Sequence, residues 1–388
     1  MAQDNNLRER ISTYFRPLRE IVKQPPNGVL KYSYLSPAPQ SVYKELWDWD
    51  AFFMGVSLTD RNPDDGIFLK NWALNYIINA QPDGKVPGCL TPEGYDPRLN
   101  HMKPFLAQGI LIASKALNDF TWIKKNWDVI KKIVLYREST MWNNKYDLAV
   151  WFDSMESGAD NNVAAYRGDY LNHDAGDYPK KSIIAVDANA YTYQEYMSIS
   201  EIASVIGMAE DSQFFERRAE TVRCNMQEHL WSDVDGIFWN LDSSTGQFIK
   251  HVSFSCFVPL YAKLATQEQA KLMIENYLLS RAHMQSKFGL RTLSASDPLY
   301  NNINMLKPHS NWQGPIWPIA NYIYVVGLKN YGYNSEAKRV SDEIAALVLT
   351  DLDKNGCMHE DYDAETGEPL AAPNFISWNL LVENMLGN

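Results

Sequence analysis

The chain has 388 residues, 45% of them apolar, and its 47 Asp and Glu against 36 Lys and Arg give a formal net charge of −11. An acidic chain is poorly suited to bind nucleic acid or an anionic membrane, because both are polyanions. No apolar run approaches the length of a transmembrane helix, and the polar N-terminal stretch has no signal-peptide core, so we expect a cytoplasmic protein with no membrane partner.

Helical periodicity recurs along most of the chain. Apolar residues at positions i, i+3, i+4 and i+7 mark one buried face of a helix. Stripes of this kind are formed by Leu69, Trp72, Ala73 and Tyr76; Ile199, Ile202, Ala203 and Ile206; Ala270, Met273, Ile274 and Tyr277; Ile316, Ile319, Ala320 and Ile323; and Trp378, Leu381, Val382 and Met385. The pattern predicts about twelve helices, beginning near residues 6, 49, 66, 104, 120, 187, 211, 256, 266, 313, 335 and 376.

Local signals also indicate where some helices begin and end. Gly207 follows the second stripe and is expected to terminate that helix. Thr266 and Gln269 have the spacing of a capping box, in which the side chains at the N-cap and three residues later satisfy each other's backbone N–H groups. Strand-like alternation is scarce and short, as in residues 236–241, so we expect only short β segments in loops.

Long connections rich in Gly, Pro, Asp and aromatic residues lie at 25–48, 82–103, 143–186, 282–312 and 353–375. No Ser/Gly linker divides the chain, so we predict a single domain over residues 1–388. Helices joined by alternating short and long connections suggest an all-α fold of six hairpins closed into a double-layered (α/α)6 barrel. Binding and catalytic groups tend to lie on loops held by a rigid scaffold, so the long loops are the place to look for a site.

The first long loop ends in "WDWDAFF", where Trp47 and Trp49 alternate with Asp48 and Asp50. One interpretation is structural: an aspartate caps the following helix and the tryptophans pack in the core. The other is a sugar site, in which a Trp face covers the apolar face of a pyranose and an Asp accepts hydrogen bonds from its hydroxyls. Such sites discriminate well, because a missing hydroxyl leaves a buried partner unpaired.

A second acidic loop, "ESGADNN", runs from Glu156 to Asn162 directly after an apolar stretch. It is either a solvated acidic turn or a loop that presents a carboxyl group to a substrate. Two further segments combine polar and aromatic residues in the same way: "NWQGPIWP" from Asn311 to Pro318, and "HEDYDAETGE" from His359 to Glu368.

These four motifs, in this order, resemble glycoside hydrolase family 63. Its members are inverting enzymes on an (α/α)6 barrel, among them α-glucosidases and mannosylglycerate or glucosylglycerate hydrolases, and they are related to trehalases. The resemblance runs from about Trp47 to Trp378. It implies a glycoside hydrolase that needs no cofactor and acts on a small α-linked glycoside.

The resemblance also implies individual roles. The Asp of "ESGADNN" corresponds to the general acid, Asp160, and the Glu of "HEDYDAETGE" to the general base, Glu360, with Glu365 and Glu368 as nearby competitors. The family pattern lines the sugar pocket with Trp47, Trp49, Asp50, Gln108, Trp312, Gln313 and Trp317. Glycoside hydrolysis does need one protonated carboxyl group for the leaving oxygen and one ionised carboxylate to activate water. Glu156 is then expected to be a hydrogen-bonding or structural partner.

A metal site is not expected. Asp351, Asp353, Asn355 and Gly356 resemble the start of a calcium loop, but Tyr362 stands where a bidentate Glu is required, so we interpret this stretch as a turn before the catalytic segment. The histidines show no HxxxH or HExxH spacing, and the four scattered cysteines form no CxxC pair.

The sequence therefore predicts an inverting, exo-acting glycoside hydrolase that cleaves a small α-linked glucoside or mannoside. The alternatives are a trehalase-like hydrolase and a catalytically silent carbohydrate-binding (α/α)6 barrel. Sugar epimerases use similar barrels but work with paired histidines, whereas this chain offers acids. Glucose and mannose differ at one hydroxyl, and the sequence leaves the choice between them open.

Overall fold

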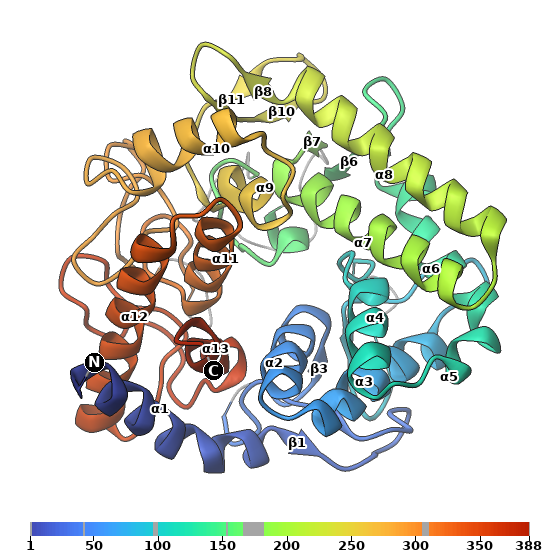
Figure 1. The fold of residues 1–388 in the computed structure, drawn as a ribbon, viewed down its shortest axis with the longest axis horizontal. Helices are drawn as coiled ribbons and strands as arrows, with labels where there is room; N and C mark the ends of the chain where they lie inside the picture. The colour runs from blue at the N-terminus through green and yellow to red at the C-terminus, as the bar shows by residue number, and fades with distance from the viewer. Residues whose placement is uncertain are drawn as a thin grey trace. The chain divides into compact units, whose positions relative to one another are not determined.

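The computed structural model describes residues 2–41, 43–95, 100–152, 154–165, 182–304 and 310–387 (Figure 1). Packing divides the chain into two compact units. Unit 1 consists of Met1–Ile11, Asn143–Ala190 and Arg223–Asn374, and unit 2 of Ser12–Trp142, Tyr191–Val222 and Phe375–Asn388. The single domain predicted over residues 1–388 stays a prediction.

Helices make up about 52% of the structure. The α-helices are α1 (Ala2–Ile21), α2 (Asp48–Arg61), α3 (Gly66–Asn79), α4 (Leu106–Ala116), α5 (Thr121–Lys124), α6 (Trp127–Thr140), α7 (Val186–Val205), α8 (Ala209–His229), α9 (Val258–Tyr261), α10 (Gln267–Met273), α11 (Pro318–Asn330), α12 (Asn334–Asn355) and α13 (Leu381–Met385). Within the described ranges, no helix combines the length and apolarity needed to cross a membrane.

The strands are short. They are β1 (Lys23–Gln24), β2 (Tyr34–Leu35), β3 (Leu46–Trp47), β4 (Cys89–Leu90), β5 (Trp142–Asn143), β6 (Leu148–Trp151), β7 (Ile183–Ile184), β8 (Trp231–Ser232), β9 (Ile237–Phe238), β10 (Asn240–Asp242) and β11 (Phe248–Ile249). In unit 1, β11, β10, β7 and β6 pair in that order as antiparallel neighbours. The alternating stretch at 236–241 contributes β9 to a hairpin with β8 and most of β10 to this sheet.

Several local predictions are confirmed. The four residues of the first stripe lie on α3, and each is fully buried. Helix α7 ends at Val205, two residues before Gly207, which has a left-handed φ of 82°. At the start of α10, the side chain of Thr266 accepts from the N–H of Gln269, and the Gln269 side chain accepts from the N–H of Thr266, as a capping box requires.

Two predicted helices differ from the structure for local reasons. The helix expected near residue 120 does begin there, at Thr121, but it ends at Lys124 as α5. A second helix, α6, follows, and the carbonyl of Asn126 begins its hydrogen bonding by accepting from Val129 and Ile130. The helix expected near residue 313 begins only at Pro318. Proline lacks an N–H and forces the preceding residue into an extended conformation, so Ile316 falls outside the helix despite its place in the apolar stripe.

The core of unit 2 is built on α3, which packs against both α2 and α4. Glycines permit this close packing: a Cβ at Gly109 on α4 would lie 2.5 Å from the ring of Trp72 on α3. In unit 1, α11 packs against both α12 and α9 (α9 yellow, α11 and α12 orange to red in Figure 1). Each unit thus places its loop motifs on a base of packed helices.

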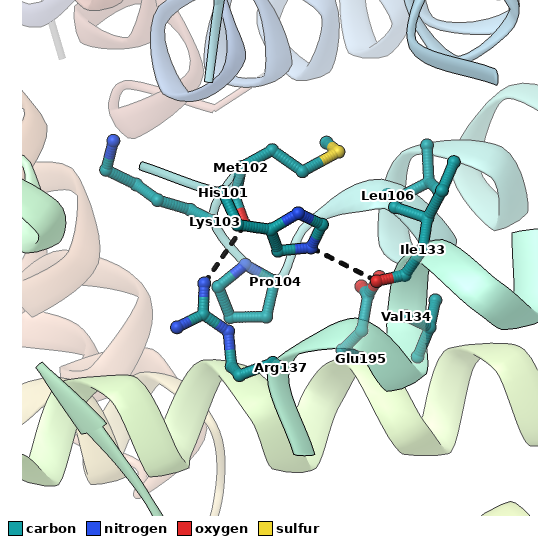
Figure 2. Close-up of a pocket in the computed structure, with 9 residues that line it drawn as sticks. All are labelled: His101, Met102, Lys103, Pro104, Leu106, Ile133, Val134, Arg137 and Glu195. Carbon is teal, nitrogen blue, oxygen red and sulfur yellow. Dashed lines mark hydrogen bonds between the residues drawn. The ribbon is translucent and has the colours of Figure 1, made fainter. Parts of the chain in front are cut away.

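A small cavity lies in unit 2 beside the N-terminus of α4 (Figure 2). Its lining comprises His101, Met102, Lys103, Pro104, Leu106, Ile133, Val134, Arg137 and Glu195. The volume of about 10 Å³ suffices for one water molecule and excludes a sugar ring. Dashed lines in Figure 2 mark the hydrogen bonds from His101 to the Ile133 carbonyl and from Arg137 to the Met102 carbonyl. This cavity is therefore a feature of the core and not a substrate pocket.

Two titratable groups of this cavity respond to burial in opposite directions. Desolvation, aided by the charge of Arg137, lowers the pKa of His101 to about 3. Desolvation also raises the pKa of Glu195 to about 7, although its carboxylate accepts hydrogen bonds from the N–H groups of Ala107 and Gln108. Both shifts disfavour the charged form of a side chain removed from water.

We expect these shifts to appear in the pH dependence of stability. Between about pH 4.5 and 7 the folded protein holds a proton on Glu195 that the unfolded chain releases, so this group stabilises the fold at low pH and loses its contribution as pH rises. Replacing Glu195 with Gln removes that dependence. The difference in unfolding free energy between wild type and Glu195→Gln should favour wild type more at pH 5 than at pH 8, by up to about 3 kcal/mol.

Urea unfolding of both proteins at the two pH values measures this difference. His101 contributes with the opposite sign, because its lowered pKa makes stability fall as pH drops below about 6.5. Since His101 is present in both proteins, its contribution cancels in the comparison. Unfolding free energies that differ by a constant across the pH range would contradict the raised pKa of Glu195.

Candidate active site

The loop that carries Asp160 follows β6 and a 3-10 turn at Ser154–Ser157. Asp160 is half-buried on this loop. Glu156 is buried, and its carboxylate accepts a hydrogen bond of 2.7 Å from the backbone N–H of Phe152. The expectation that Glu156 is a structural partner is confirmed, and Asp160 is the acid that the loop leaves nearer the surface.

The two asparagines after Asp160 attach the loop to distant parts of unit 1. Asn161 accepts from the N–H of Trp312 at 2.6 Å and donates to Oδ1 of Asn311 at 3.0 Å. Asn162 donates to the hydroxyl of Ser255 at 2.6 Å. The "ESGADNN" and "NWQGPIWP" motifs, far apart in the sequence, are thus in direct contact.

The segment that carries Glu360 lies against the other end of "NWQGPIWP". Ile316 and Tyr362 form an antiparallel bridge, with N–H to carbonyl distances of 2.8 and 3.0 Å. Glu360, two residues before Tyr362, is only 6% exposed. Residues 311–316 therefore connect the two segments that carry the predicted acid and base.

Asp351 holds the base segment from the other side. This buried aspartate, in the last turns of α12, accepts from Nδ1 of His359 at 2.9 Å and from the hydroxyl of Tyr362 at 3.0 Å. Burial alone would raise the pKa of Asp351, but the hydrogen bonds from His359, Asn355 and Tyr362 together keep it below its usual value. The residues on both sides of Glu360 are thus fixed by one ionised side chain.

The structure distinguishes Glu360 from Glu365 and Glu368, the two other candidates for the general base. Nε and Nη2 of Arg291 donate to the carboxylate of Glu365, as does the hydroxyl of Tyr300, and these bonds lower the pKa of Glu365. Glu368 forms an ion pair of 2.6 Å with Lys354 at the surface. The side chains of Glu365 and Glu368 are 54% and 60% exposed. Both are engaged in ion pairs at the surface, which favours Glu360 as the base.

Trp312 and Trp317, both predicted to line the sugar pocket, lie in the interior of unit 1. Their rings stack on each other with centroids 4.3 Å apart and planes 21° apart, and each residue is 1% exposed. Gln313 is also buried, and its amide donates to the carbonyl of Asn161 at 3.2 Å. These residues support the loop carrying Asp160, and their predicted contact with sugar stays a prediction.

Three of the predicted pocket residues of unit 2, Trp47, Trp49 and Asp50, lie at the start of α2, and Gln108 lies on α4. Trp47 is half-buried, whereas Trp49 is buried against Phe53 and Trp378, with ring centroids 6.2 and 5.8 Å away. Gln108 donates to the Pro104 carbonyl at 2.7 Å.

The two aspartates of this motif have different partners. Asp48 is the first residue of α2, accepts from the N–H of Trp49 and forms an ion pair of 3.2 Å with Lys103. The N-cap of α2 is Trp47, which makes no side-chain capping bond, so the interpretation in which an aspartate caps this helix is wrong. Asp50 accepts a hydrogen bond of 2.7 Å from the hydroxyl of Ser377. Desolvation raises the pKa of Asp50 to about 7, against this bond and the nearby charge of Lys103. Asp50 is thus a half-buried carboxyl group whose pKa lies near neutral pH.

The calcium-like stretch does not form a loop. Asp351, Asp353 and Asn355 lie on α12, which continues to Asn355 and ends at Gly356, whose left-handed φ of 70° stops the helix. The turn that we predicted over this stretch therefore begins only at Gly356. Among the residues that the structure describes, no three His, Cys, Asp or Glu side chains are grouped as metal ligands would be.

Sequence reasoning assigned no role to Asp187, a buried polar residue beside these segments. Asp187, at the start of α7, accepts from Nε1 of Trp151 at 2.9 Å and from the N–H of Ala188. Burial raises the pKa of Asp187 despite these bonds. Its position in a polar helix start was visible in the sequence, but its partners were not.

Comparisons with known proteins show the family and the fold of the chain. A family model described as the mannosylglycerate hydrolase MGH1-like glycoside hydrolase domain matches residues 43–378. The mannosyl-oligosaccharide glucosidase of Saccharomyces cerevisiae is 25% identical over 235 residues, which are 54% of this chain and 28% of that protein. Mannosylglycerate hydrolase MGH1 of Selaginella moellendorffii is 32% identical over 153 residues, which are 39% of this chain and 29% of that protein. The chain thus spans less than a third of the length of either relative.

Among solved structures, the crystal structure of a glycoside hydrolase family 63 mannosylglycerate hydrolase from Thermus thermophilus, in complex with Tris and D-glycerate, superimposes with a TM-score of 0.74 at 17% identity. The match covers 97% of this chain and 100% of that one. This likeness confirms the predicted fold class, the (α/α)6 barrel. Since the family model matches most of its length, the chain belongs to the family of mannosylglycerate hydrolase MGH1-like glycoside hydrolase domains.

Proposed function

We propose that the protein hydrolyses a small α-linked glucoside or mannoside, releasing the terminal sugar with inversion of its anomeric configuration. Asp160 is the general acid and Glu360 the general base. The observation that supports this assignment best is the packing of both carboxyl-bearing segments against residues 311–316, through Asn161 on one side and Tyr362 on the other. The two competing glutamates are held in surface ion pairs.

The reaction follows from these roles. Asp160 gives its proton to the glycosidic oxygen as the bond from that oxygen to the anomeric carbon breaks. A water molecule forms a new bond to the anomeric carbon from the opposite face, and its proton passes to Glu360. An inverting pair of carboxyl groups stands about 6.5–9.5 Å apart to leave room for this water. Neither acid lies in a motif that suggests a dedicated nucleophile.

The names of the relatives support the substrate class. One relative is a glucosidase and another a mannosylglycerate hydrolase, and the superimposed crystal structure holds D-glycerate. A glycoside of glucose or mannose with a small anionic aglycone is therefore the first substrate to test. The predicted pocket residues Trp47, Trp49, Asp50 and Gln108 would contribute aromatic faces and hydrogen-bonding groups. The cytoplasmic location remains part of the proposal.

A panel of α-linked substrates tests the proposed function. It should contain glucosylglycerate, mannosylglycerate, trehalose, kojibiose, sucrose and the p-nitrophenyl α-glycosides of glucose and mannose. We expect hydrolysis of at least one glucoside or mannoside, with loss in Asp160→Asn. Turnover of trehalose alone would favour the trehalase-like alternative. Binding of sugars in a thermal-shift assay without any hydrolysis would favour the silent carbohydrate-binding barrel and contradict the proposal.

A further inference from the structure

Four carboxamide side chains next to Asp160 are joined in a closed ring of hydrogen bonds. Nδ2 of Asn161 donates to Oδ1 of Asn311 at 3.0 Å, and Nδ2 of Asn311 donates to Oδ1 of Asn301 at 2.8 Å. Nδ2 of Asn301 donates to Oε1 of Gln313 at 3.1 Å, and Nε2 of Gln313 donates to the backbone carbonyl of Asn161 at 3.2 Å. The ring therefore begins and ends on the residue that follows the predicted acid.

Three members of the ring are buried, Asn301 is half-buried, and the ring is closely packed. Asn161 and Asn311 are fully buried, and Gln313 is nearly so. Gly314 has a φ of 155°, and a Cβ at this position would lie 2.3 Å from the carbonyl oxygen of Asn301. Only glycine, which has no side chain, lets the segment at 314 approach the segment at Asn301 this closely. A buried amide that loses its partner costs about 1–3 kcal/mol, so the ring resists rearrangement.

The same segment that closes the ring also contacts the base segment. Asn302, next to Asn301, accepts from the N–H of Ala364 at 2.9 Å. The hydroxyl of Tyr300 donates to Glu365. Residues 300–302 therefore touch both the ring beside Asp160 and the segment that follows Glu360.

We propose that this amide ring is a positioning device for the general acid, in which Asn301 and Asn311 act through Asn161 to hold the carboxyl group of Asp160 at the glycosidic oxygen. The ring touches no reacting atom. Its members are uncharged at every physiological pH, so they orient Asp160 without adding a charge that would alter its affinity for a proton. A displacement of a catalytic group by about 1 Å can cost on the order of a hundredfold in rate.

This inference rests on the proposed function, and leaving-group dependence provides its test. A fluoride leaving group departs with little help from an acid, whereas an alkoxide needs a proton in the transition state. The experiment measures kcat/KM of wild type, Asn301→Ala and Asn311→Ser on an α-glycosyl fluoride and on the methyl α-glycoside of the same sugar. Each variant should lose on the order of tenfold or more on the methyl glycoside and stay within about twofold of wild type on the fluoride.

Asn330→Ala is the matched control. Asn330, like Asn301, is half-buried in unit 1, and its side chain donates to two backbone carbonyls outside the ring, those of Leu260 and Tyr261. Its truncation should leave the ratio of the two kcat/KM values unchanged. Circular dichroism tests whether each variant is folded. If a ring variant does not fold, Asn301→Ser is measured in its place.

The outcomes separate the inference from the proposed function. Equal losses on both substrates in folded ring variants, or no loss on either, would overturn the positioning role while leaving hydrolysis by Asp160 and Glu360 intact. A wild-type protein that hydrolyses neither substrate in the α series of glucose or mannose would overturn the proposed function and the inference with it.

Discussion

Asp160→Asn is expected to lower kcat/KM on an alkyl α-glycoside by on the order of a thousandfold, because the variant has no proton to give to the leaving oxygen. Asn has the size and shape of Asp, so the loop should keep its contacts through Asn161 and Asn162. Steady-state kinetics on the methyl and p-nitrophenyl glycosides of the sugar identified by the substrate panel measures the effect.

Leaving-group dependence makes this result specific. The loss should be largest for methyl, smaller for p-nitrophenyl and smallest for the glycosyl fluoride, since the need for protonation falls in that order. Sugar binding, measured by isothermal titration with the released monosaccharide, should be preserved. Normal turnover of the methyl glycoside by Asp160→Asn would show that another residue is the acid.

Glu360→Gln is expected to lower kcat/KM on all three substrates by a similar factor, on the order of a thousandfold. The reason is that water must lose a proton whatever group departs. The contrast with Asp160→Asn is the essential observation: one variant loses activity in proportion to the leaving group's need for a proton, the other uniformly. Kinetics on the same three glycosides measures it.

Glu365→Gln and Glu368→Gln are the matched controls for this variant. Both residues lie within the same motif, but Glu365 pairs with the buried Arg291 and Glu368 with the exposed Lys354. The same change from Glu to Gln at these positions should leave most of the activity, because neither carboxylate takes part in the proposed reaction. If Glu365→Gln or Glu368→Gln removed activity and Glu360→Gln did not, the base would have to be reassigned.

The sequence allowed the helices of this fold to be predicted because their cores are periodic. The stripe on α3 is completely buried, and the capping box at Thr266 forms as predicted. The exceptions have local causes. Ile316 continues an apolar stripe, but Pro318 prevents a helix from extending back to it, and it pairs with Tyr362 instead.

The candidate site was harder to predict because its contacts join residues that are distant in the sequence. The motif pattern indicated Asp160 and Glu360 but could not show which glutamates form ion pairs, since Arg291 and Lys354 lie outside the motif. Asn301 and Asn311 carry no charge and follow no periodicity, so their spacing in the sequence does not predict that they form a hydrogen-bonded ring with Asn161. The rings of Trp312 and Trp317 stack on each other in the interior, a contact that the sequence did not indicate, and their predicted contact with sugar stays a prediction.

The anomer that is released first tests the central claim most directly. Proton NMR of the anomeric region, recorded during the first minutes of hydrolysis of an α-linked substrate, distinguishes the β-anomer from the α-anomer before mutarotation equilibrates them. An acid at Asp160 and a base at Glu360 with water between them predict that the β-anomer accumulates first. Early accumulation of the α-anomer would indicate a covalent glycosyl intermediate and would contradict the role of Glu360 as a general base.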